Sequence, residues 1–373
     1  MTINDREAFA PETGHPEIQE LIQSGYRQNR LPHALLFYGP EGCGKDALAI
    51  AVAQLVNCAP PGGQIDRAST QYLKIAHLQH PDLKFIFPTP SKTNLKDDEL
   101  LEALREKARN PYRRILFPNK NVFIGIDTVR ELKQEARYKV YEGQKKVFII
   151  SEADQMRVEA ANALLKLLEE PPDNLMLILT TSNIYKILPT IKSRCQLFRF
   201  SPLPEERIRD LVERYAGPAN PAKLPLIVRL AGHNMKRIFD FLEKDVIAMR
   251  DQAIEFLRKT WSIHKSQELL EILEPIASGK DREEARLLLW FLLLWFQDIL
   301  HLQKGAAESA ELLNLDQKVA LEKFLSYIPG ADIAGIVWEI EAALKDLDDP
   351  RNYNPLLILS TLAIKLNKKI TKQ

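Results

Sequence analysis

The feature that most constrains the fold of this chain is a glycine-rich loop with the spacing G-x-x-x-x-G-K, which ends at Lys45. The loop lies between a short apolar run, residues 34–38, and a stretch in which Ala and Leu recur at helical spacing. Gly39, Gly42 and Gly44 allow backbone N–H groups to close around a phosphate, and the start of the helix adds partial positive charge. In this context the motif predicts a nucleotide-phosphate site, with Lys45 reaching the outer phosphates.

The residues that normally bind Mg²⁺ beside such a loop are replaced. Asp46 stands where Ser or Thr supplies a hydroxyl ligand, and Ser151 stands where an Asp follows the buried strand at 147–150. Glu152 remains as a vestige of the catalytic Glu that usually comes next. We therefore expect a degenerate site, where ATP or another nucleotide can bind through the backbone and Lys45 but is not hydrolysed efficiently. The alternative is a glycine-rich turn that binds nothing.

Strands and helices are expected to alternate in the first part of the chain. The sequence predicts strands at five apolar runs, residues 34–38, 83–87, 147–150, 175–179 and 197–200. Their alternation with helices indicates an α/β domain with a parallel sheet over residues 1–200. No convincing strand is expected after it, so we predict a small helical domain at 201–245 and a larger all-helical domain at 246–373.

The composition is that of a globular protein without a strong overall charge. The 373 residues are 45% hydrophobic and 27% charged, with a formal net charge of +1. This charge gives no overall attraction to nucleic acid or anionic lipid, although it does not exclude a local basic face. The longest apolar run, residues 287–296, falls short of the roughly 18 residues that a membrane span needs, so it predicts a buried core helix. Without a signal pattern at the N-terminus, we expect a cytoplasmic location.

Residues 88–121 form an insertion within the first domain. They contain eight Lys or Arg against five Asp or Glu, a small positive excess. One interpretation is a solvated surface insertion with one helix, and the other is a contact surface for DNA or a partner. A charge excess of this size does not separate the two.

Three further motifs occur in a specific order. Residues 31–37, Leu-Pro-His-Ala-Leu-Leu-Phe, run directly into the glycine-rich loop. Residues 160–172 contain Asn-Ala-Leu-Leu-Lys and end in Glu-Glu-Pro-Pro, and Ser193-Arg194-Cys195 follows the next strand. Together these motifs resemble the AAA+ clamp-loader ATPases, strongly over about residues 14–201 and weakly over the helical remainder. The resemblance implies a P-loop domain, a small helical lid and an all-α collar that holds subunits in a ring.

The resemblance also implies roles for single residues. Arg194 would be an arginine finger that acts in trans, on a nucleotide bound by the neighbouring subunit. Thr181 or Ser182 would be the polar sensor-1 contact at the end of a strand, and Lys236 or Arg237 would fill the sensor-2 position on the lid. Outside the resemblance, Arg194 is interpreted as a surface arginine at the end of a loop, and the lid pair as an exposed basic helix face.

The cysteines depart from a pattern that many clamp-loader relatives carry, a four-cysteine zinc module after the phosphate-loop helix. Cys58 stands alone in that region, and Cys43 and Cys195 lie far from it in the sequence. A single thiol does not build a tetrahedral structural site, so we predict that no zinc is bound.

We favour the hypothesis that the chain is a non-motor subunit of a clamp loader. Its partners would be the other clamp-loader subunits, the sliding clamp and primer–template DNA, with no membrane partner. The alternative is an active AAA+ ATPase, as a motor subunit of a clamp loader or a helicase loader. A third hypothesis is a nucleic-acid-binding protein that uses residues 88–121.

Overall fold

The computed structural model describes Phe9 and residues 14–59, 65–91, 93–117, 120–218, 223–261, 266–278, 282–303, 312–328, 330–347, 349, 351 and 353–371. The chain divides into two compact units. The first comprises Met1–Asn220 and Ala231–Asp240, and the second comprises Pro221–Leu230 and Phe241–Gln373.

The first unit is built on a parallel sheet of five strands. They are β1 (Ala34–Tyr38), β2 (Leu83–Ile86), β3 (Lys146–Ile150), β4 (Leu175–Thr181) and β5 (Gln196–Arg199). The strand order is β2-β3-β4-β1-β5, and every neighbouring pair is parallel. In this register Leu36 of β1 lies opposite Leu179 of β4 and Leu197 of β5. The predicted parallel α/β sheet is confirmed.

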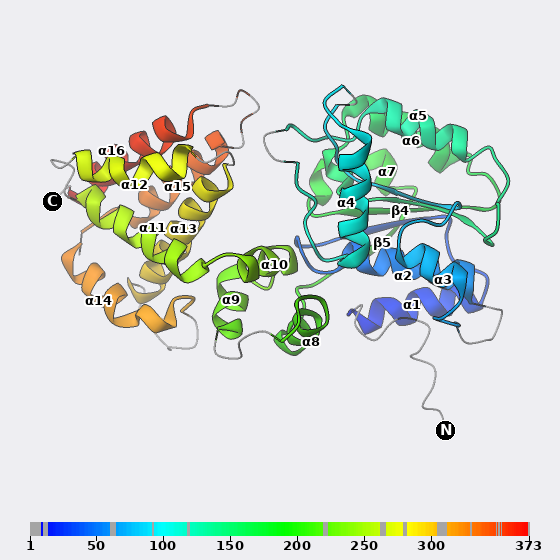
Figure 1. Cartoon of the computed structure of the whole chain (residues 1–373), viewed down its shortest axis with the longest axis horizontal. Coiled ribbons are helices and arrows are strands. Elements are labelled where there is room, and N and C mark those ends of the chain that lie inside the picture. Colours follow the sequence, from blue (N-terminus) through cyan, green and yellow to red (C-terminus); the bar gives the residue numbers. More distant parts are fainter. Residues whose placement is uncertain are drawn as a thin grey trace. The chain divides into compact units, whose positions relative to one another are not determined.

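Helices cover both faces of the sheet (Figure 1). One face carries α1 (Pro16–Arg27), α2 (Lys45–Cys58) and α3 (Thr70–Ala76). The other carries α5 (Ile126–Glu135), α6 (Val158–Glu169) and α7 (Pro189–Lys192). The short 3-10 turns η2 (Ala153–Gln155) and η3 (Ile184–Lys186) follow β3 and β4.

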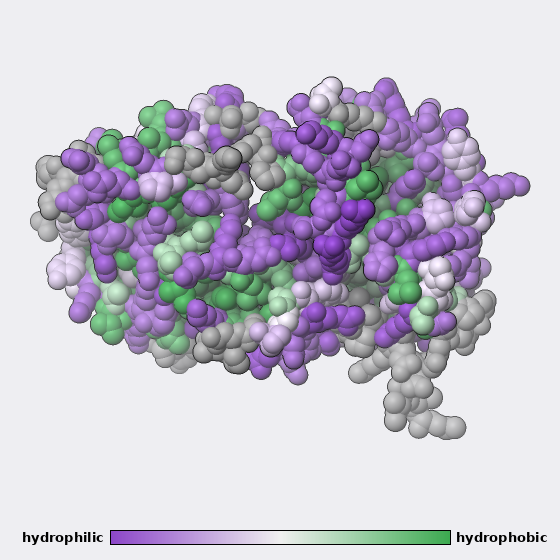
Figure 2. Space-filling model, in the orientation of Figure 1, coloured by the Kyte–Doolittle hydropathy of each residue, from purple (hydrophilic) through white to green (hydrophobic). Residues whose placement is uncertain are grey.

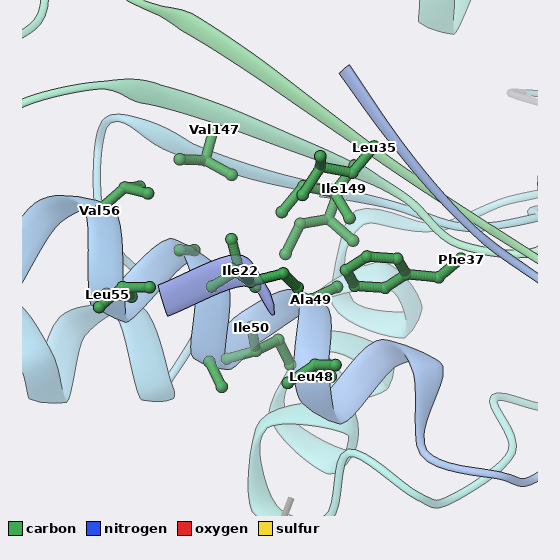
Figure 3. Packing of buried hydrophobic residues seen from close by; sticks show 14 of the residues in the cluster. Ile22, Leu35, Phe37, Leu48, Ala49, Ile50, Leu55, Val56, Val147 and Ile149 are labelled. Carbon is green, nitrogen blue, oxygen red and sulfur yellow. The ribbon is translucent and has the colours of Figure 1, made fainter. Parts of the chain in front are cut away.

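Alternation along the strands divides the apolar residues between the two faces. Leu35 and Phe37 of β1 join the cluster that contains Leu48 and Ala49 of α2, as Figure 3 shows, whereas Leu36 packs into the opposite cluster. Every residue of β3 and β4 is buried, because helices cover the sheet from both sides. Each fully buried Leu or Phe contributes roughly 1.5–3 kcal/mol relative to its exposed state.

The insertion contains the expected helix, α4 (Asp97–Arg109), drawn in cyan in Figure 1. An antiparallel bridge between Thr89 and Phe123 brings the two ends of the insertion together. The outward side of α4 is hydrophilic (Figure 2), while Leu100, Ala103 and Leu104 pack against the core beside α2. Residues 92, 118 and 119 of this segment lie outside the described residues.

After β5, the described part of the chain forms helices and one 3-10 turn. The first unit adds α8 (Glu205–Ala216), and the boundary between the units falls within α10 (Met235–Glu243). The remaining helices are α9 (Leu224–Ala231), α11 (Val246–Trp261), α12 (Ser266–Ser278), α13 (Glu283–Gln303), the 3-10 turn η4 (Leu315–Gln317), α14 (Lys318–Tyr327), α15 (Ile333–Leu347) and α16 (Pro355–Thr371). No strand follows Arg199 in the described part of the chain.

Helix α13 contains the long apolar run. It packs against α11, α14 and α15, and the rings of Trp295 and Phe296 meet Phe324 edge to face. By length and hydropathy alone α13 could cross a membrane, but 61% of its apolar window is buried within the protein. This burial is the environment predicted for a core helix.

Candidate functional site

The glycine-rich loop connects β1 to α2, which begins at Lys45. Gly42 and Gly44 have φ values of 71° and 91°, in the left-handed region that favours glycine. A Cβ atom on Gly42 would lie 2.0 Å from Oδ1 of Asn234, so the segment before α10 approaches the loop very closely. The backbone N–H of Met235 also donates a hydrogen bond of 3.1 Å to the carbonyl of Gly42. The loop therefore has the predicted strand–loop–helix context, and residues 234–235 lie against it.

The ammonium of Lys45 is directed at the loop itself. Its Nζ donates hydrogen bonds to the carbonyl oxygens of Gly39, at 2.9 Å, and of Pro40. The residue is 8% exposed. In this conformation Lys45, which the sequence predicts to contact phosphate, instead stabilises the fold of the loop.

Asp46 lies at the centre of a buried polar cluster. Its Oδ1 accepts hydrogen bonds from the hydroxyls of Ser151, at 2.9 Å, and Thr180, at 2.8 Å. Its Oδ2 lies 2.8 Å from Nζ of Lys107. Burial by itself raises the pKa of Asp46, but the Lys107 and Lys236 ammonium groups, together with the hydrogen bonds, hold that pKa well below its usual value. Asp46 is therefore a buried carboxylate with a cation and two hydroxyls around it.

Lys107 reaches this cluster from α4, in the insertion. It is 3% exposed, and Nζ also donates a hydrogen bond of 3.2 Å to the carbonyl of Arg113. Burial lowers the pKa of Lys107, and the Asp46 carboxylate opposes that shift. The sequence reasoning did not single out Lys107. It follows Leu100, Ala103 and Leu104 at helical spacing on the buried face, and this pattern could have identified it.

A second cation, Lys236 of α10, also lines the pocket. Its Nζ is hydrogen-bonded to Oε1 of Glu152 and lies 3.6 Å from Oε1 of Glu41. Burial lowers the pKa of Lys236, but the nearby carboxylates of Glu152, Glu41 and Asp46 outweigh burial and raise it. Of the two basic residues proposed for the sensor-2 position, Lys236 lines the cavity beside the loop. The positive charge of Arg237 also acts to lower the pKa of Glu41, and the backbone N–H of Arg237 donates a hydrogen bond to the side chain of Asn234.

Little space remains between these groups. The cavity beside the loop has a volume of about 30 Å³, lined by loop residues together with Tyr112, Glu152 and Lys236. Sites for small molecules typically enclose about 300–1,000 Å³, and a water molecule takes up about 30 Å³ of liquid. In this conformation the pocket has room for a water molecule or two but not for a triphosphate.

The two threonines at the end of β4 have different partners. Thr180 donates to Asp46 and accepts a hydrogen bond of 3.3 Å from the backbone N–H of Glu152. Thr181 and Ser182, the two alternatives for sensor 1, both line the same cavity, but the hydroxyl of Thr181 donates to Asp154 at 2.6 Å. Of the two threonines, Thr180 is the one whose hydroxyl bonds to the Asp46 carboxylate, and the sequence did not single it out.

Arg194 lies between α7 and β5, and its side chain is 35% exposed. Its Nη2 lies 2.8 Å from Oε1 of Glu169, and its Nη1 donates to the carbonyl of Thr190 at 2.9 Å. Glu169 belongs to the Glu-Glu-Pro-Pro motif, so two of the motifs that carry the family resemblance contact each other. The neighbouring Cys195 is buried, and burial raises the pKa of its thiol to about 12.

The three cysteines are free. Among the described residues there is no group of three or more His, Cys, Asp or Glu side chains placed to hold a metal ion. Cys58 ends α2, and residues 60–64, which follow the helix, lie outside the described part of the chain. The absence of zinc stays a prediction.

Comparison with known proteins agrees with the motifs. The delta′ subunit of DNA polymerase III from Bacillus subtilis is 27% identical over 306 residues, which is 82% of each chain. The gamma/tau subunit of DNA polymerase III from Mycobacterium bovis is 27% identical over 256 residues, and the matched part spans 39% of its length. A solved structure of a DNA polymerase III gamma subunit-related protein from Thermotoga maritima aligns with 94% of this chain, at 18% identity and a TM-score of 0.49.

The family match covers the sheet, the glycine-rich loop and the Ser-Arg-Cys motif. Residues 14–204, more than half of the chain, match the family described as "DNA polymerase III, delta subunit". The chain belongs to the DNA polymerase III delta-subunit family, and the resemblance that its motifs predicted is confirmed.

Proposed function

We propose that this chain is the delta′-like, non-motor subunit of a clamp loader. In DNA replication it would assemble with the motor and delta subunits and help to load the sliding clamp onto primer–template DNA, in the cytoplasm. Its relatives are subunits of DNA polymerase III, which supports partners of this kind. The observation that carries the proposal is the combination of a filled, ion-paired phosphate pocket with a partly exposed Arg194.

The pocket supports weak or absent hydrolysis by this chain. Efficient phosphoryl transfer needs metal ligands that neutralise the charge developing on the phosphates. Here the carboxylate of Asp46 is paired with Lys107, and Glu152 is hydrogen-bonded to Lys236. Nucleotide binding through Lys45 and the loop backbone would require these lysines to move, because the cavity is about 30 Å³.

Arg194 supports a role in trans. A guanidinium is planar and permanently charged, so it can contact a phosphoryl group through two parallel hydrogen bonds. Its pairing with Glu169 is partly exposed, at 35% and 44% for the two side chains, and exposed ion pairs are weak. A neighbour's phosphate could therefore replace Glu169 at low cost. Arginine fingers of this kind raise rates by about 10³–10⁵.

The domain assignment follows the same proposal. Residues 1–200 would form the P-loop domain, 201–245 the lid and 246–373 the collar through which the subunits assemble. Within the lid segment, Lys236 would fill the sensor-2 position, since its ammonium lies beside the loop. Thr181, together with Thr180, would fill the sensor-1 position at the end of β4.

The test is ATP turnover by the reconstituted complex with the sliding clamp and primed DNA. Arg194→Ala should lower turnover at least about tenfold without loss of assembly, because the finger acts on a neighbour's site. Lys45→Ala in the same chain should leave turnover unchanged. Turnover by the isolated chain that disappears with Lys45→Ala would instead establish the active-ATPase alternative, which the intact loop and Glu152 favour.

The nucleic-acid hypothesis has less support from the insertion. Lys107 is paired with Asp46, Lys120 with Glu99, and Arg114 lies 3.5 Å from Glu41. These pairings reduce the positive charge that the insertion presents to a phosphate backbone. Salt-dependent DNA binding by the isolated chain that is lost on neutralising Arg113 and Arg114 would favour this hypothesis.

A further inference from the structure

The ligand types that hold Mg²⁺ beside a P-loop are present here in exchanged positions. The residue after the loop lysine normally supplies a hydroxyl and the strand end a carboxylate, whereas this chain has the Asp46 carboxylate at the start of α2 and the Ser151 hydroxyl directly after β3. The two side chains are hydrogen-bonded at 2.9 Å, and Thr180 adds a second hydroxyl at 2.8 Å. By chemistry alone, these oxygen atoms suit a hard cation such as Mg²⁺.

A cation from the chain itself already holds that carboxylate. Nζ of Lys107 lies 2.8 Å from Oδ2 of Asp46 and is 6.0 Å from the ring centroid of Phe85. Lys107 and Asp46 are 3% and 8% exposed, so water screens their attraction little. A divalent ion bound to Asp46 would lie beside this ammonium, and the two positive charges would repel each other. In this conformation the site therefore does not fit Mg²⁺.

The insertion keeps Lys107 in place. At the start of α4, the Glu99 carboxylate accepts a hydrogen bond of 3.1 Å from the backbone N–H of Lys96, and the insertion is closed at its base by the bridge between Thr89 and Phe123. At the other end of the helix, the Asn110 side chain accepts a hydrogen bond of 3.0 Å from the backbone N–H of Tyr112. The next residue is Arg113, whose carbonyl accepts a hydrogen bond from Lys107. The ammonium thus reaches the loop on a structured helix.

We propose that Lys107 is a built-in cation that replaces Mg²⁺ in this pocket, so that the loop, α4 and the strand ends are held together without metal or nucleotide. This inference rests on the proposed non-motor function. In such a subunit the pocket beside the glycine-rich loop would serve as a structural ion-pair cluster. Lys236, bonded to Glu152 and close to Glu41, closes the lid side of the same cluster. The fold of the chain should then be insensitive to Mg²⁺.

The test is the thermal unfolding of the full chain with Mg²⁺ and with EDTA. The wild-type Tm should be the same in both. Lys107→Ala should lower the Tm by about 5–15 °C, because it leaves the Asp46 carboxylate buried without its cation. Millimolar Mg²⁺ should restore at least a third of that loss, because the freed space then adjoins a carboxylate and two hydroxyls. Arg105→Ala on the exposed side of α4, whose partner is Glu102, is the matched control and should show neither effect.

A second pair of variants keeps the test decisive if Lys107→Ala does not fold. Lys107→Met preserves most of the volume without the charge, and Lys107→Met with Asp46→Asn removes both charges together. The double variant should melt at a higher temperature than Lys107→Met alone. A wild-type Tm that rises with Mg²⁺, a Lys107→Met Tm equal to that of wild type, or a double variant no more stable than Lys107→Met would each overturn the proposal. These readouts come from the isolated chain, so they are separate from the turnover of the complex that tests the proposed function.

Discussion

Arg194 and Glu169 form an ion pair of 2.8 Å that joins the Ser-Arg-Cys motif to the Glu-Glu-Pro-Pro motif, 25 residues apart along the chain. The proposed arginine finger is therefore held by a carboxylate of its own subunit. Both side chains are partly exposed, so the pair orients the guanidinium more than it stabilises the fold.

Glu169→Gln should release Arg194 without removing it. We expect the free energy of unfolding to change by less than about 1 kcal/mol, because exposed pairs contribute little. In the reconstituted complex, turnover should stay within about threefold of wild type, against a loss of at least about tenfold for Arg194→Ala. Glu170→Gln, at the exposed neighbouring position, is the control. If Glu169→Gln lost as much turnover as Arg194→Ala, Glu169 would itself be needed to position the finger.

Asp46 should make the stability of the first unit depend on pH in the acidic range. Its folded pKa lies below its unfolded value, so its stabilising effect is present above about pH 4 and is lost as the pH falls towards the folded pKa. Asp46→Asn should cost about 3–5 kcal/mol at pH 7, because it leaves the Lys107 ammonium buried and unpaired. Urea unfolding between pH 3 and 7 checks both effects. A slope below pH 4 that Asp46→Asn does not reduce would assign that slope to other carboxylates.

Asp82 should anchor the loop that precedes β3. Its carboxylate accepts hydrogen bonds of 2.8, 2.9 and 2.9 Å from the backbone N–H groups of Tyr141, Glu142 and Gly143. Asp82→Ala should therefore destabilise the chain by about 2–4 kcal/mol. Limited proteolysis should show faster cleavage near Tyr141, whereas Asp173→Ala, at an exposed loop position, should change neither property. Unchanged cleavage in Asp82→Ala would mean that other contacts order this loop.

Gly42→Ala should separate residues 234–235 from the phosphate loop. A Cβ atom at this position would lie 2.0 Å from Oδ1 of Asn234 and 2.7 Å from the backbone nitrogen of Met235. Gly232→Ala is a matched control, because Gly232 has a similar φ, 62° against 71°, and a Cβ atom there would meet no described atom within 4 Å. Gly232→Ala should cost about 1–2 kcal/mol through its backbone conformation alone, and Gly42→Ala at least about 1 kcal/mol more. Equal losses in chemical denaturation would show that residues 234–235 move aside without strain.

Local patterns in the sequence determined the framework of this protein. The glycine spacing up to Lys45, the apolar runs of the five strands and the continuous apolar run in α13 each predict an element that the structure contains. These predictions work because a phosphate loop, a buried parallel strand and a core helix are specified by residues within a few positions of one another.

The tertiary structure decided which side chains meet at the site. The sequence shows that Asp46 and Ser151 depart from the usual metal-binding pattern. It does not show that Lys107 of the insertion, 61 residues from Asp46, supplies the cation that pairs with the Asp46 carboxylate. Nor does spacing along the chain reveal that Thr180, rather than Thr181, bonds to Asp46. Such partners are set by how strands and helices pack, since charge pairing depends on distance in space and on exclusion of water.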